Sequence, residues 1–447
     1  MKARHFELKI EQEVLHSAKN IYFVGIGGVS MSGLAHMTLH NGKNVWGCDR
    51  QTSVVTQALA QSGAHILEDG TPLPPACDLL VYSLAIPQDH PALLDAKRRG
   101  IPLISRGEYL AFIANQYPTH VAVAGCHGKS TVVGMLAHIF THAGLSPQVA
   151  GGAPLSLSGD CYRIGEGEVF LLEACEYKKS FLSLSPTFAV ITNLDFDHPD
   201  AYPTFSHVKE AFSSFISQSQ QVILCGDCPP LMEIAPKNSI TYGFSPTCDL
   251  RGILVGRNMQ VWEKENLLGT IRLRLFGDYN YQNALAAICC GRQMGLPFYQ
   301  MKQALQSFEG IGRRMEYRGS IQGGRVYLDY AHHPKEIESA ILAAKTQGQE
   351  VFVIFQPHTY TRTYSLWKEF IAALVLANKT TLVDIYAARE APIEGVTAER
   401  LAREGGFHYA PTLEDAIKEM LPHMKEGAIL ILMGAGDVPK ALNFLKF

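Results

Sequence analysis

Residues 121–132, V-A-V-A-G-C-H-G-K-S-T-V, have the composition of a phosphate-binding loop. The strict form of such a loop, G-x-x-x-x-G-K-[ST], would require glycine at Val123, so this stretch departs from it. Its physical requirements are still met, because we predict a strand that ends at Ala124 and a helix that begins near Lys129 with its free N–H groups facing the loop. The alternative is a tight turn with a chance lysine.

Lysine and serine at the start of this helix have specific uses in a phosphate site. The ammonium of Lys129 would meet the β- and γ-phosphates, and the Ser130 hydroxyl would ligate Mg²⁺. Cys126 beside His127 could instead suggest a thiol nucleophile, although adjacent residues seldom form such a pair. We therefore predict ATP and Mg²⁺ as ligands. The loop residues assigned to ATP are Gly125, Cys126, His127, Gly128, Lys129, Ser130 and Thr131.

Polar residues follow two further apolar stretches at the point where each predicted strand ends. Glu173 closes V-F-L-L-E-A, and F-A-V-I-T-N-L-D-F-D-H ends with Asn193, Asp195, Asp197 and His198. A lone acid or histidine after a strand is usually a solvated loop residue. Open α/β sheets, however, bind ligands at the carboxyl ends of their strands. Together with the lysine-serine loop, these residues favour a magnesium–nucleotide site, with Glu173 and His198 as further metal ligands.

Three stretches share the order apolar strand, turn and helix that would position such a site: residues 21–37, 121–136 and 351–358. Each strand is nearly continuous in Val, Ile, Leu and Phe, as parallel strands buried on both faces are. Helices must then cover both faces of each sheet, which predicts an α/β fold. Residues 241–275 contain short segments rich in β-formers and predict an antiparallel excursion. Other expected strands are N-V-W-G-C-D, D-L-L-V-Y-S, I-P-L-I-S, Q-V-I-L-C, T-T-L-V-D-I-Y and A-I-L-I-L-M-G-A-G.

The length of 447 residues exceeds one hydrophobic core and fits three domains, which we place at residues 1–108, 109–311 and 312–447. A hydrophobic fraction of 47% and a net charge of −3 suit a soluble protein with no long-range attraction to nucleic acid. We find no secretion signal and no apolar run long enough for a membrane span, so we expect a cytoplasmic location. The ten cysteines are expected to be reduced, and Cys225 and Cys228 lack a second pair at zinc-site spacing.

A second glycine motif near the N-terminus permits two interpretations. Gly25, Gly27 and Gly28, followed by Asp49 after the next predicted strand, resemble a dinucleotide fingerprint, but Ser30 replaces its third glycine. This motif would suit a nicotinamide dehydrogenase. The same physics binds any diphosphate at a helix N-terminus, including that of a UDP-sugar.

The order of motifs along nearly the whole chain resembles that of the Mur ligases. The segments are G-I-G-G-V-S-M-S-G, G-C-H-G-K-S-T, E-A-C-E-Y-K-K-S-F-L, T-N-L-D-F-D-H, N-Y-Q-N-A-L-A-A, G-R-R-M, D-Y-A-H-H-P, Q-P-H-T-Y-T-R, Y-A-A-R-E and M-G-A-G-D-V. The resemblance implies a Rossmann-like N-terminal domain, a central P-loop ATPase-type domain with a mixed sheet, and a Rossmann-like C-terminal domain. It also implies ATP-dependent ligation of L-alanine to the lactyl carboxylate of UDP-N-acetylmuramate through an acyl phosphate, in peptidoglycan precursor synthesis.

The resemblance further implies roles for individual residues. Lys129, Glu173, His198 and His332 would be catalytic, and Ser130, Glu173 and His198 would hold the metal. The UDP-sugar would contact Gly27, Gly28, Met31, Ser32, Asp49 and Ser83; ATP would also contact Asn280, Asn283 and Arg314; L-alanine would contact Tyr330, His332 and Arg362.

The chain departs from the usual family pattern at a few positions. Cys126 and Ser130 replace threonines of the phosphate loop, Ser30 replaces a glycine, and Tyr279 replaces a histidine near the expected adenine contacts. None of these changes removes an essential charge. Lys209 does not match the spacing of the modified lysine that sister ligases use, so we leave it outside the site.

Three alternatives remain open from the sequence. A dehydrogenase would use the first glycine motif but leave Lys129, Glu173 and His198 without a role. A non-catalytic nucleotide sensor would not need an amino-acid pocket around His332 and Arg362. A sister ligase that attaches a recovered peptide would usually differ in the first glycine motif.

Overall fold

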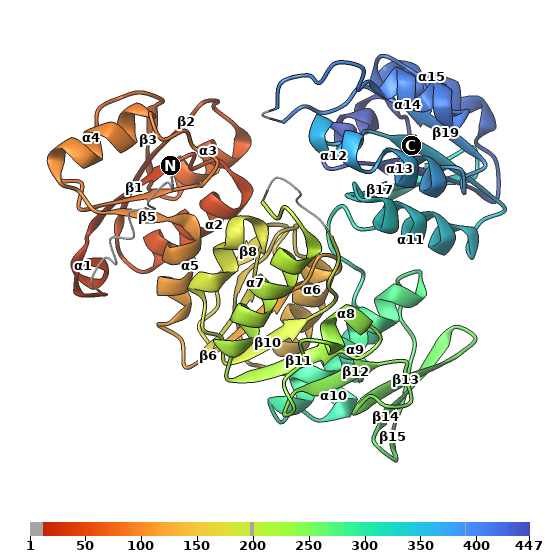
Figure 1. Cartoon of the computed structure of the whole chain (residues 1–447), viewed down its shortest axis with the longest axis horizontal. Helices are drawn as coiled ribbons and strands as arrows, with labels where there is room; N and C mark the ends of the chain where they lie inside the picture. Colours follow the sequence, from red (N-terminus) through yellow and green to blue (C-terminus); the bar gives the residue numbers. More distant parts are fainter. Residues whose placement is uncertain (1–11, 197–200, 389) are drawn as a thin grey trace.

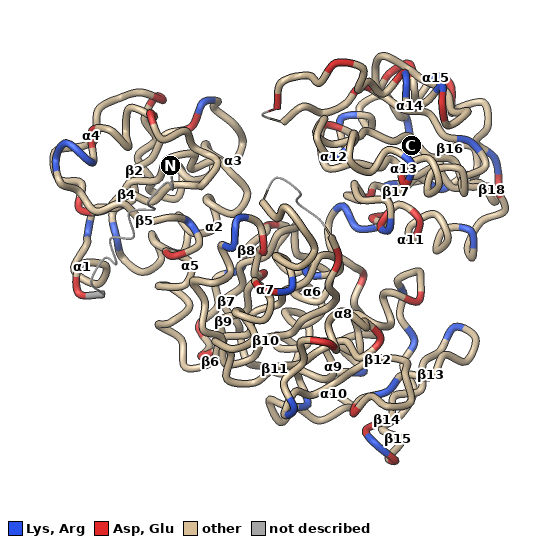
Figure 2. The backbone as a smooth tube through the Cα atoms, viewed as in Figure 1, with Lys and Arg blue, Asp and Glu red and all other residues tan. Residues whose placement is uncertain are grey.

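The computed structural model describes residues 12–196, 201–388 and 390–447. It contains three β-sheets of five, ten and six strands, which follow one another along the chain. Figure 1 shows three lobes: the N-terminal lobe is red and orange, the central lobe runs from orange through yellow to green, and the C-terminal lobe is teal and blue. Residues of both charge signs are spread over all three lobes (Figure 2). Within the described part of the chain, no helix is both long and apolar enough to cross a membrane.

The N-terminal sheet is entirely parallel, with strand order β3-β2-β1-β4-β5. Its strands are nearly all apolar, and helices cover them, as expected for a sheet buried on both faces. The strands are β1 (Asn20–Val24), β2 (Asn44–Asp49), β3 (His65–Glu68), β4 (Leu79–Tyr82) and β5 (Leu103–Ser105); the helices are α1 (Gln12–Ser17), α2 (Val29–His40), α3 (Val54–Gln61), α4 (Pro91–Arg99) and α5 (Arg106–Ala114).

The central sheet is mixed and has the order β15-β14-β13-β12-β11-β10-β6-β9-β7-β8. Strands β13 to β15 pair antiparallel, which confirms the predicted antiparallel excursion. The strands are β6 (Thr119–Ala124), β7 (Gln148–Ala150), β8 (Tyr162–Arg163), β9 (Val169–Glu173), β10 (Phe188–Ile191), β11 (Gln221–Cys225), β12 (Ile240–Gly243), β13 (Leu250–Val255), β14 (Asn258–Glu263) and β15 (Asn266–Ile271). The helices are α6 (Lys129–His142), η1 (Tyr177–Ser183), α7 (Phe205–Ser217), α8 (Pro229–Met232), α9 (Asp278–Gln293) and α10 (Phe298–Ser307).

The C-terminal sheet has the order β16-β17-β21-β18-β19-β20, and only the edge strand β16 pairs antiparallel. Helix α11 lies on the side of this lobe that faces the central lobe (Figure 1). The strands are β16 (Glu316–Ile321), β17 (Gly324–Asp329), β18 (Glu350–Phe355), β19 (Lys379–Leu382), β20 (His408–Tyr409) and β21 (Ala428–Met433); the helices are α11 (Pro334–Lys345), α12 (Tyr360–Ser365), α13 (Trp367–Leu374), α14 (Ala398–Gly405), α15 (Leu413–Met420), η2 (Leu421–His423) and η3 (Val438–Phe444).

The fold class predicted from the sequence is confirmed: an α/β protein with Rossmann-like N- and C-terminal sheets and a mixed central sheet. The predicted strand end at Ala124 and helix start at Lys129 also agree with β6 and α6. The domain limits remain predictions. The limit at residue 311/312 falls between the second and third sheets, whereas the limit at 108/109 falls inside α5.

A glycine on α6 allows close packing between this helix and the end of the central domain. A Cβ atom added at Gly134 would lie 2.4 Å from Ile311 Cγ2 and 3.3 Å from the Phe308 ring. Ile311 is buried, and its backbone pairs with Leu155 in an isolated bridge. Ile311 therefore has little freedom to move away. The packing of α6 requires glycine at position 134.

We predict that Gly134→Ala destabilises the protein by about 1–3 kcal/mol, the usual cost of overpacking, despite the better helix propensity of alanine. Chemical denaturation monitored by circular dichroism would measure the loss. Gly291→Ala on α9 is the matched control, because its added Cβ meets the flexible sulfur of Met301. Equal losses in the two variants would contradict the packing argument.

Candidate active site

The loop between β6 and α6 has the geometry of a phosphate cradle. Gly125 and Gly128 have φ values of 130° and 83°, which side-chain-bearing residues rarely adopt. A Cβ atom at Gly128 would lie 2.6 Å from Asn283 Oδ1, so glycine is also required by close approach to α9. Gly128 is the N-cap of α6 and provides no side-chain cap, which leaves the first N–H groups of the helix for an anion.

Asn193, which follows β10, holds this loop in place. Its Oδ1 accepts hydrogen bonds from the backbone N–H groups of Cys126 (3.1 Å) and His127 (2.9 Å), and its Nδ2 donates to the His127 carbonyl (2.9 Å). Thr192 also donates to that carbonyl at 2.6 Å. The polar residues expected at the end of this strand therefore order the loop directly.

The ammonium of Lys129 is held in a buried acidic setting. Its Nζ lies 3.0 Å from Glu176 Oε2 and donates to the Gly125 carbonyl at 2.5 Å. Burial opposes the charge, but the Coulomb attraction of Glu176 and Glu173 outweighs it and raises the pKa of Lys129. The lysine is therefore charged and aimed at the loop. Sequence reasoning did not single out Glu176, although it lies in the E-A-C-E-Y-K-K segment.

Ser130 and Glu173, two predicted metal ligands, lie side by side. The Ser130 hydroxyl donates to Glu173 Oε2 at 2.7 Å, and the Gly152 N–H donates to the same oxygen at 3.0 Å. A hydroxyl and a carboxylate supply the oxygen ligands that Mg²⁺ prefers, so the residues present fit that ion. The third predicted ligand, His198, and the nearby Asp197 lie outside the described residues.

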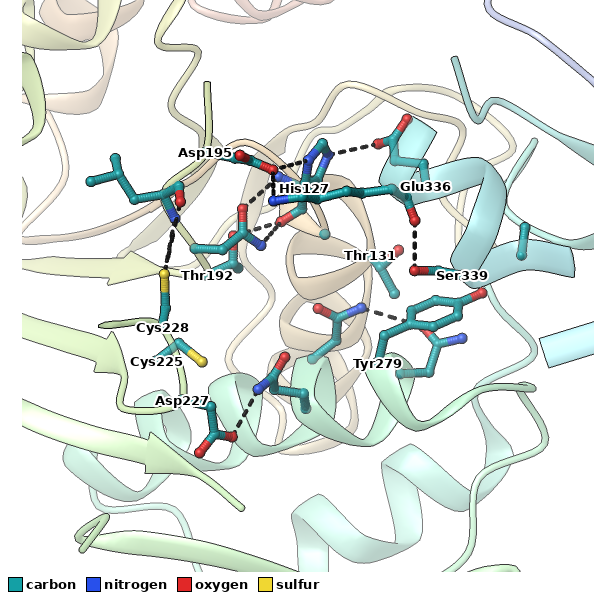
Figure 3. A pocket seen from close by; sticks show the side chains of 18 of the residues that line it. His127, Thr131, Thr192, Asp195, Cys225, Asp227, Cys228, Tyr279, Glu336 and Ser339 are labelled. Carbon is teal, nitrogen blue, oxygen red and sulfur yellow. Dashed lines mark hydrogen bonds and ion pairs between the residues drawn. The ribbon is translucent and has the colours of Figure 1, made fainter. Parts of the chain in front are cut away.

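A cavity of about 620 Å³ lies beside the loop, between α9 of the central lobe and α11 of the C-terminal lobe. Figure 3 shows His127, Asp195 and Glu336 at the top of the view, Cys228, Cys225 and Asp227 down its left side, and Tyr279 and Ser339 on the right. Tyr279 lines the wall where the family pattern has a histidine. The ATP-assigned residues that line the cavity are His127, Gly128, Thr131, Asn280, Asn283 and Arg314.

Charged residues of the central and C-terminal lobes meet in the lining of this cavity. His127 lies between Asp195 (3.6 Å) and Glu336 (3.3 Å), as Figure 3 shows. Lys335 pairs with Asp195 at 2.6 Å, and Arg314 approaches Glu336 at 3.4 Å. These contacts connect the phosphate loop to the first turn of α11. Sequence reasoning missed Lys335 and Glu336, although they directly follow D-Y-A-H-H-P.

The same contacts shift the proton affinity of the groups involved. Burial lowers the pKa of His127, but hydrogen bonds to Asp195 and Glu336 outweigh this and raise it to about 9. Burial works against the charge of Glu336, yet His332, His127 and Arg314 hold its pKa well below the usual value. At neutral pH, the interface therefore carries a charged histidine between two carboxylates.

The residues predicted to hold an amino acid also lie together. The rings of Tyr330 and His332 are 5.3 Å apart, and those of His332 and His358 are 5.9 Å apart. Arg362 reaches His358 at 3.4 Å, and the Arg313 guanidinium covers the Tyr330 ring at 4.6 Å. The group lies after the carboxyl ends of β17 and β18, the edge that binds ligands in parallel sheets.

A second cavity, of about 650 Å³, lies at the first glycine motif. Of the residues assigned to the UDP-sugar, Gly27, Gly28, Met31, Asp49 and Ser83 line it. Ser32 does not, since it lies buried in α2 and its hydroxyl donates to the Val29 carbonyl at 3.0 Å.

Arg106, the first residue of α5, lines this cavity without having been predicted. It also lines a small cavity of about 120 Å³ that reaches Glu173, and Cys175 belongs to both cavities. This smaller cavity, which we call the narrow passage, lies between the first glycine motif and Glu173. The sequence gave no sign that Arg106 lines both cavities, because a single arginine after a serine N-cap is common at helix starts.

Comparisons with known proteins agree with the three-lobed architecture. Models of the Mur ligase family, catalytic domain, of the Mur ligase middle domain, and of the Mur ligase, glutamate ligase domain match residues 20–118, 123–291 and 313–436. The chain is 37% identical over 452 residues to the UDP-N-acetylmuramate–L-alanine ligase of Syntrophus aciditrophicus, covering 96% of this chain and 93% of that protein.

Solved structures share the fold. The UDP-N-acetylmuramate–alanine ligase of Thermotoga maritima superposes with a TM-score of 0.79 at 24% identity, covering 95% of this chain and 98% of that one. A murein peptide ligase of Psychrobacter arcticus gives a TM-score of 0.71 at 24% identity, with 95% and 98% of the two chains covered.

We predict that the contribution of His127 to stability is lost between about pH 6.5 and pH 9. Its folded pKa of about 9 exceeds the ordinary 6.5, so its charge stabilises the fold below pH 6.5, and this stabilisation fades as pH rises through 9. The melting temperature of the protein without ligands should therefore fall over this range. His127→Asn should flatten the fall.

Thermal unfolding at several pH values would measure the effect. His142→Asn, an exposed histidine at the other end of α6, is the control and should keep the wild-type slope. A wild-type slope in His127→Asn would show that the pair with Glu336 does not stabilise the fold.

Proposed function

The chain belongs to the Mur ligase family, and we propose that it joins L-alanine to the lactyl carboxylate of UDP-N-acetylmuramate, with conversion of ATP to ADP and phosphate. The observation that carries this proposal is the convergence of three sites. The phosphate loop with Ser130 and Glu173 lies between the cavity at the first glycine motif and the residues around His332. Three substrates on three domains need such a meeting point.

The chemistry requires an activated carboxylate, because amide formation from a carboxylate and an amine is uphill in water. In the first step, a lactyl oxygen attacks the γ-phosphorus, the bond to ADP breaks, and an acyl phosphate forms. Two anions must approach one another in this step. The charged Lys129, held at the loop by Glu176, supplies the electrostatic compensation.

In the second step, the L-alanine nitrogen attacks the acyl carbon, a C–N bond forms and phosphate leaves with the electron pair of the C–O bond. A proton must leave the amine. His332 is our candidate to accept it: the Tyr330 carbonyl, 3.0 Å from its Nδ1, can only accept a hydrogen bond, so the neutral ring carries its proton there. Arg362 is the candidate to hold the carboxylate of the amino acid.

Magnesium fits beside this loop through the Ser130 hydroxyl and the Glu173 carboxylate, with His198 as a proposed third ligand. When bound, it would neutralise phosphate charge. We assign the ATP phosphates to the loop, and the adenosine to the adjoining cavity that Asn280, Asn283 and Arg314 line. The cytoplasmic location expected from the sequence remains a prediction.

The other functions considered from the sequence are less well supported. The relatives are ligases, which does not favour a nicotinamide dehydrogenase or a non-catalytic sensor. A peptide-attaching ligase shares the fold, but the relative with 37% identity carries the L-alanine activity in its name. L-Alanine is therefore the proposed acceptor.

An ADP-release assay with and without UDP-N-acetylmuramate, over a panel of amino acids and one tripeptide, tests the function. We predict release that requires both the UDP-sugar and L-alanine.

Lys129→Met should abolish turnover but leave UDP-sugar binding nearly intact. Because this variant leaves Glu176 buried without its cation, Lys129→Met/Glu176→Gln is the second variant, which removes both charges.

The exposed Lys237→Ala serves as a control with the same loss of charge. ADP release from the folded double variant at the wild-type rate would remove the loop from the reaction. Release with the tripeptide and not with L-alanine would reassign the acceptor.

We predict that Glu173→Gln raises the Mg²⁺ concentration needed for half-maximal activity by at least tenfold. The amide keeps the size of the side chain but removes the negative charge beside Ser130. A magnesium titration of activity would measure the change. Glu166→Gln, an exposed acid before β9, is the matched control, and equal titrations of the two variants would remove Glu173 from the metal site.

A further inference from the structure

The cavity at the first glycine motif, which we call the N-terminal cavity, contains an acid that has no role in the proposed reaction. This acid is Asp69, and hydrogen bonds fix its orientation. Asp69 follows β3 and lines the cavity at the first glycine motif. Its Oδ1 accepts hydrogen bonds from His90 Nε2 (2.9 Å) and from the Cys48 thiol (3.5 Å). Among the residues that the structure describes, no donor reaches Asp69 Oδ2, and its side chain is 30% exposed. One carboxylate oxygen thus remains for a ligand.

The hydrogen bonds of His90 determine which of its ring nitrogens carries the proton. The residue is the N-cap of α4, and its Nδ1 accepts the backbone N–H of Ala92 at 3.2 Å. A neutral ring that accepts at Nδ1 carries its proton on Nε2. The histidine therefore donates to Asp69 and fixes which carboxylate oxygen turns away from the cavity.

Cys48, Asp69 and His90 have the donor types of a metal site, and their ligand atoms lie within 4.8 Å of one another. A metal at His90 Nε2 would place the ring proton on Nδ1 and abolish the cap of α4. Burial also raises the pKa of the Cys48 thiol to about 11, which disfavours the thiolate that a metal needs. The three groups are arranged to share protons instead of binding a cation.

The N-terminal cavity adjoins the narrow passage at one end only. Arg106 and Cys175 lie at the end that continues through the narrow passage to Glu173. The lactyl carboxylate must reach that passage if it is to meet the phosphate loop. The sugar therefore belongs at this end, the diphosphate at the glycine motif, and the uridine at the end with Asp69 and His90.

Asp49, the acid predicted for this region, is already engaged. Its Oδ2 accepts the Gly27 N–H at 2.9 Å, and its Oδ1 accepts the Gln51 N–H at 3.4 Å. It braces the glycine turn and lies close enough to Gly27 that an added Cβ there would meet Oδ2 at 3.0 Å. Asp69 is the acid with an oxygen left for the ligand.

We propose that Asp69 is a specificity-determining residue that accepts a hydrogen bond from the uridine of the UDP-sugar, and that His90 is the positioning residue that orients it. This inference rests on the proposed function. The donor is either the uracil ring N–H or a ribose hydroxyl, since both present the hydrogen that a carboxylate oxygen requires.

Asp69→Asn gives the sharpest test. The fixed Nε2–H of His90 would draw the amide oxygen of the variant, which turns its NH₂ group toward the uridine donor. We expect KM for UDP-N-acetylmuramate to rise by about 10- to 100-fold, the range for loss of a hydrogen bond to a charged group, while kcat and the KM values for ATP and L-alanine change little. Asp89→Asn, an exposed neighbour of His90 outside the cavity lining, is the matched control.

Competition with UDP, its 2′-deoxy analogue and its N3-methyl analogue identifies the donor. The wild-type protein should bind one analogue more weakly than UDP, and Asp69→Asn should lose this discrimination. Equal binding of all three by the wild type, or discrimination that survives in Asp69→Asn, would overturn the inference. If the wild-type protein releases no ADP with UDP-N-acetylmuramate and L-alanine, the proposed function fails instead.

His90→Asn tests the positioning role. Asparagine caps helices well, so α4 should keep its cap and the melting temperature should stay unchanged, while the shorter side chain no longer reaches Asp69. We expect a smaller rise in KM for the UDP-sugar than in Asp69→Asn, with kcat unchanged. A wild-type KM would exclude the positioning role.

Discussion

The buried charge of Lys129 is the constraint on which the rest of the central site depends. An ammonium that is only 12% exposed is stable only with compensating charge, and Glu176, itself 3% exposed at its side chain, supplies it. This pairing keeps the lysine charged and close to the loop carbonyls before any ligand arrives. A phosphate entering the cradle meets a preformed cation and the N–H groups of α6, so little reorganisation is needed when charge moves during the reaction. Asn193 contributes by fixing the loop backbone itself.

Alignment of the central and C-terminal lobes follows from the contacts around this charge. His127 belongs to the same loop as Lys129, and through Glu336 it reaches the first turn of α11. That turn directly follows the segment with Tyr330 and His332, so a contact with the loop also sets the position of the proposed amino-acid site. Orientation effects of this kind can supply roughly 7–11 kcal/mol of a barrier. The cross-lobe pairs are therefore best understood as part of the alignment, with their stability contribution secondary.

Most of the fold and the central part of the site could be predicted because they depend on local pattern. Continuous apolar strands, glycine turns and Lys129-Ser130 signal the parallel sheets and the phosphate loop by themselves, and Glu173 follows from its place at a strand end. Glu176, Glu336 and Arg106 could not be predicted, because their roles come from tertiary approach: a buried partner, a cross-lobe contact and a passage shared by two cavities. Ser32 illustrates the reverse case, since its position in the motif suggests a ligand while helix packing turns its hydroxyl inward.

The narrow passage between the two larger cavities limits how a substrate can lie. At about 120 Å³ it admits a small acyl group, whereas the neighbouring cavity of about 650 Å³ can hold a nucleotide with its sugar. A substrate bound with its nucleotide toward Glu173 would have to place its largest part in the smallest cavity. Arg106, at the junction, would attract an anionic end and so favours entry of a carboxylate. Size and charge together thus favour one direction along the N-terminal cavity, so Asp69, at its far end, lies with the nucleotide and away from the bond that forms.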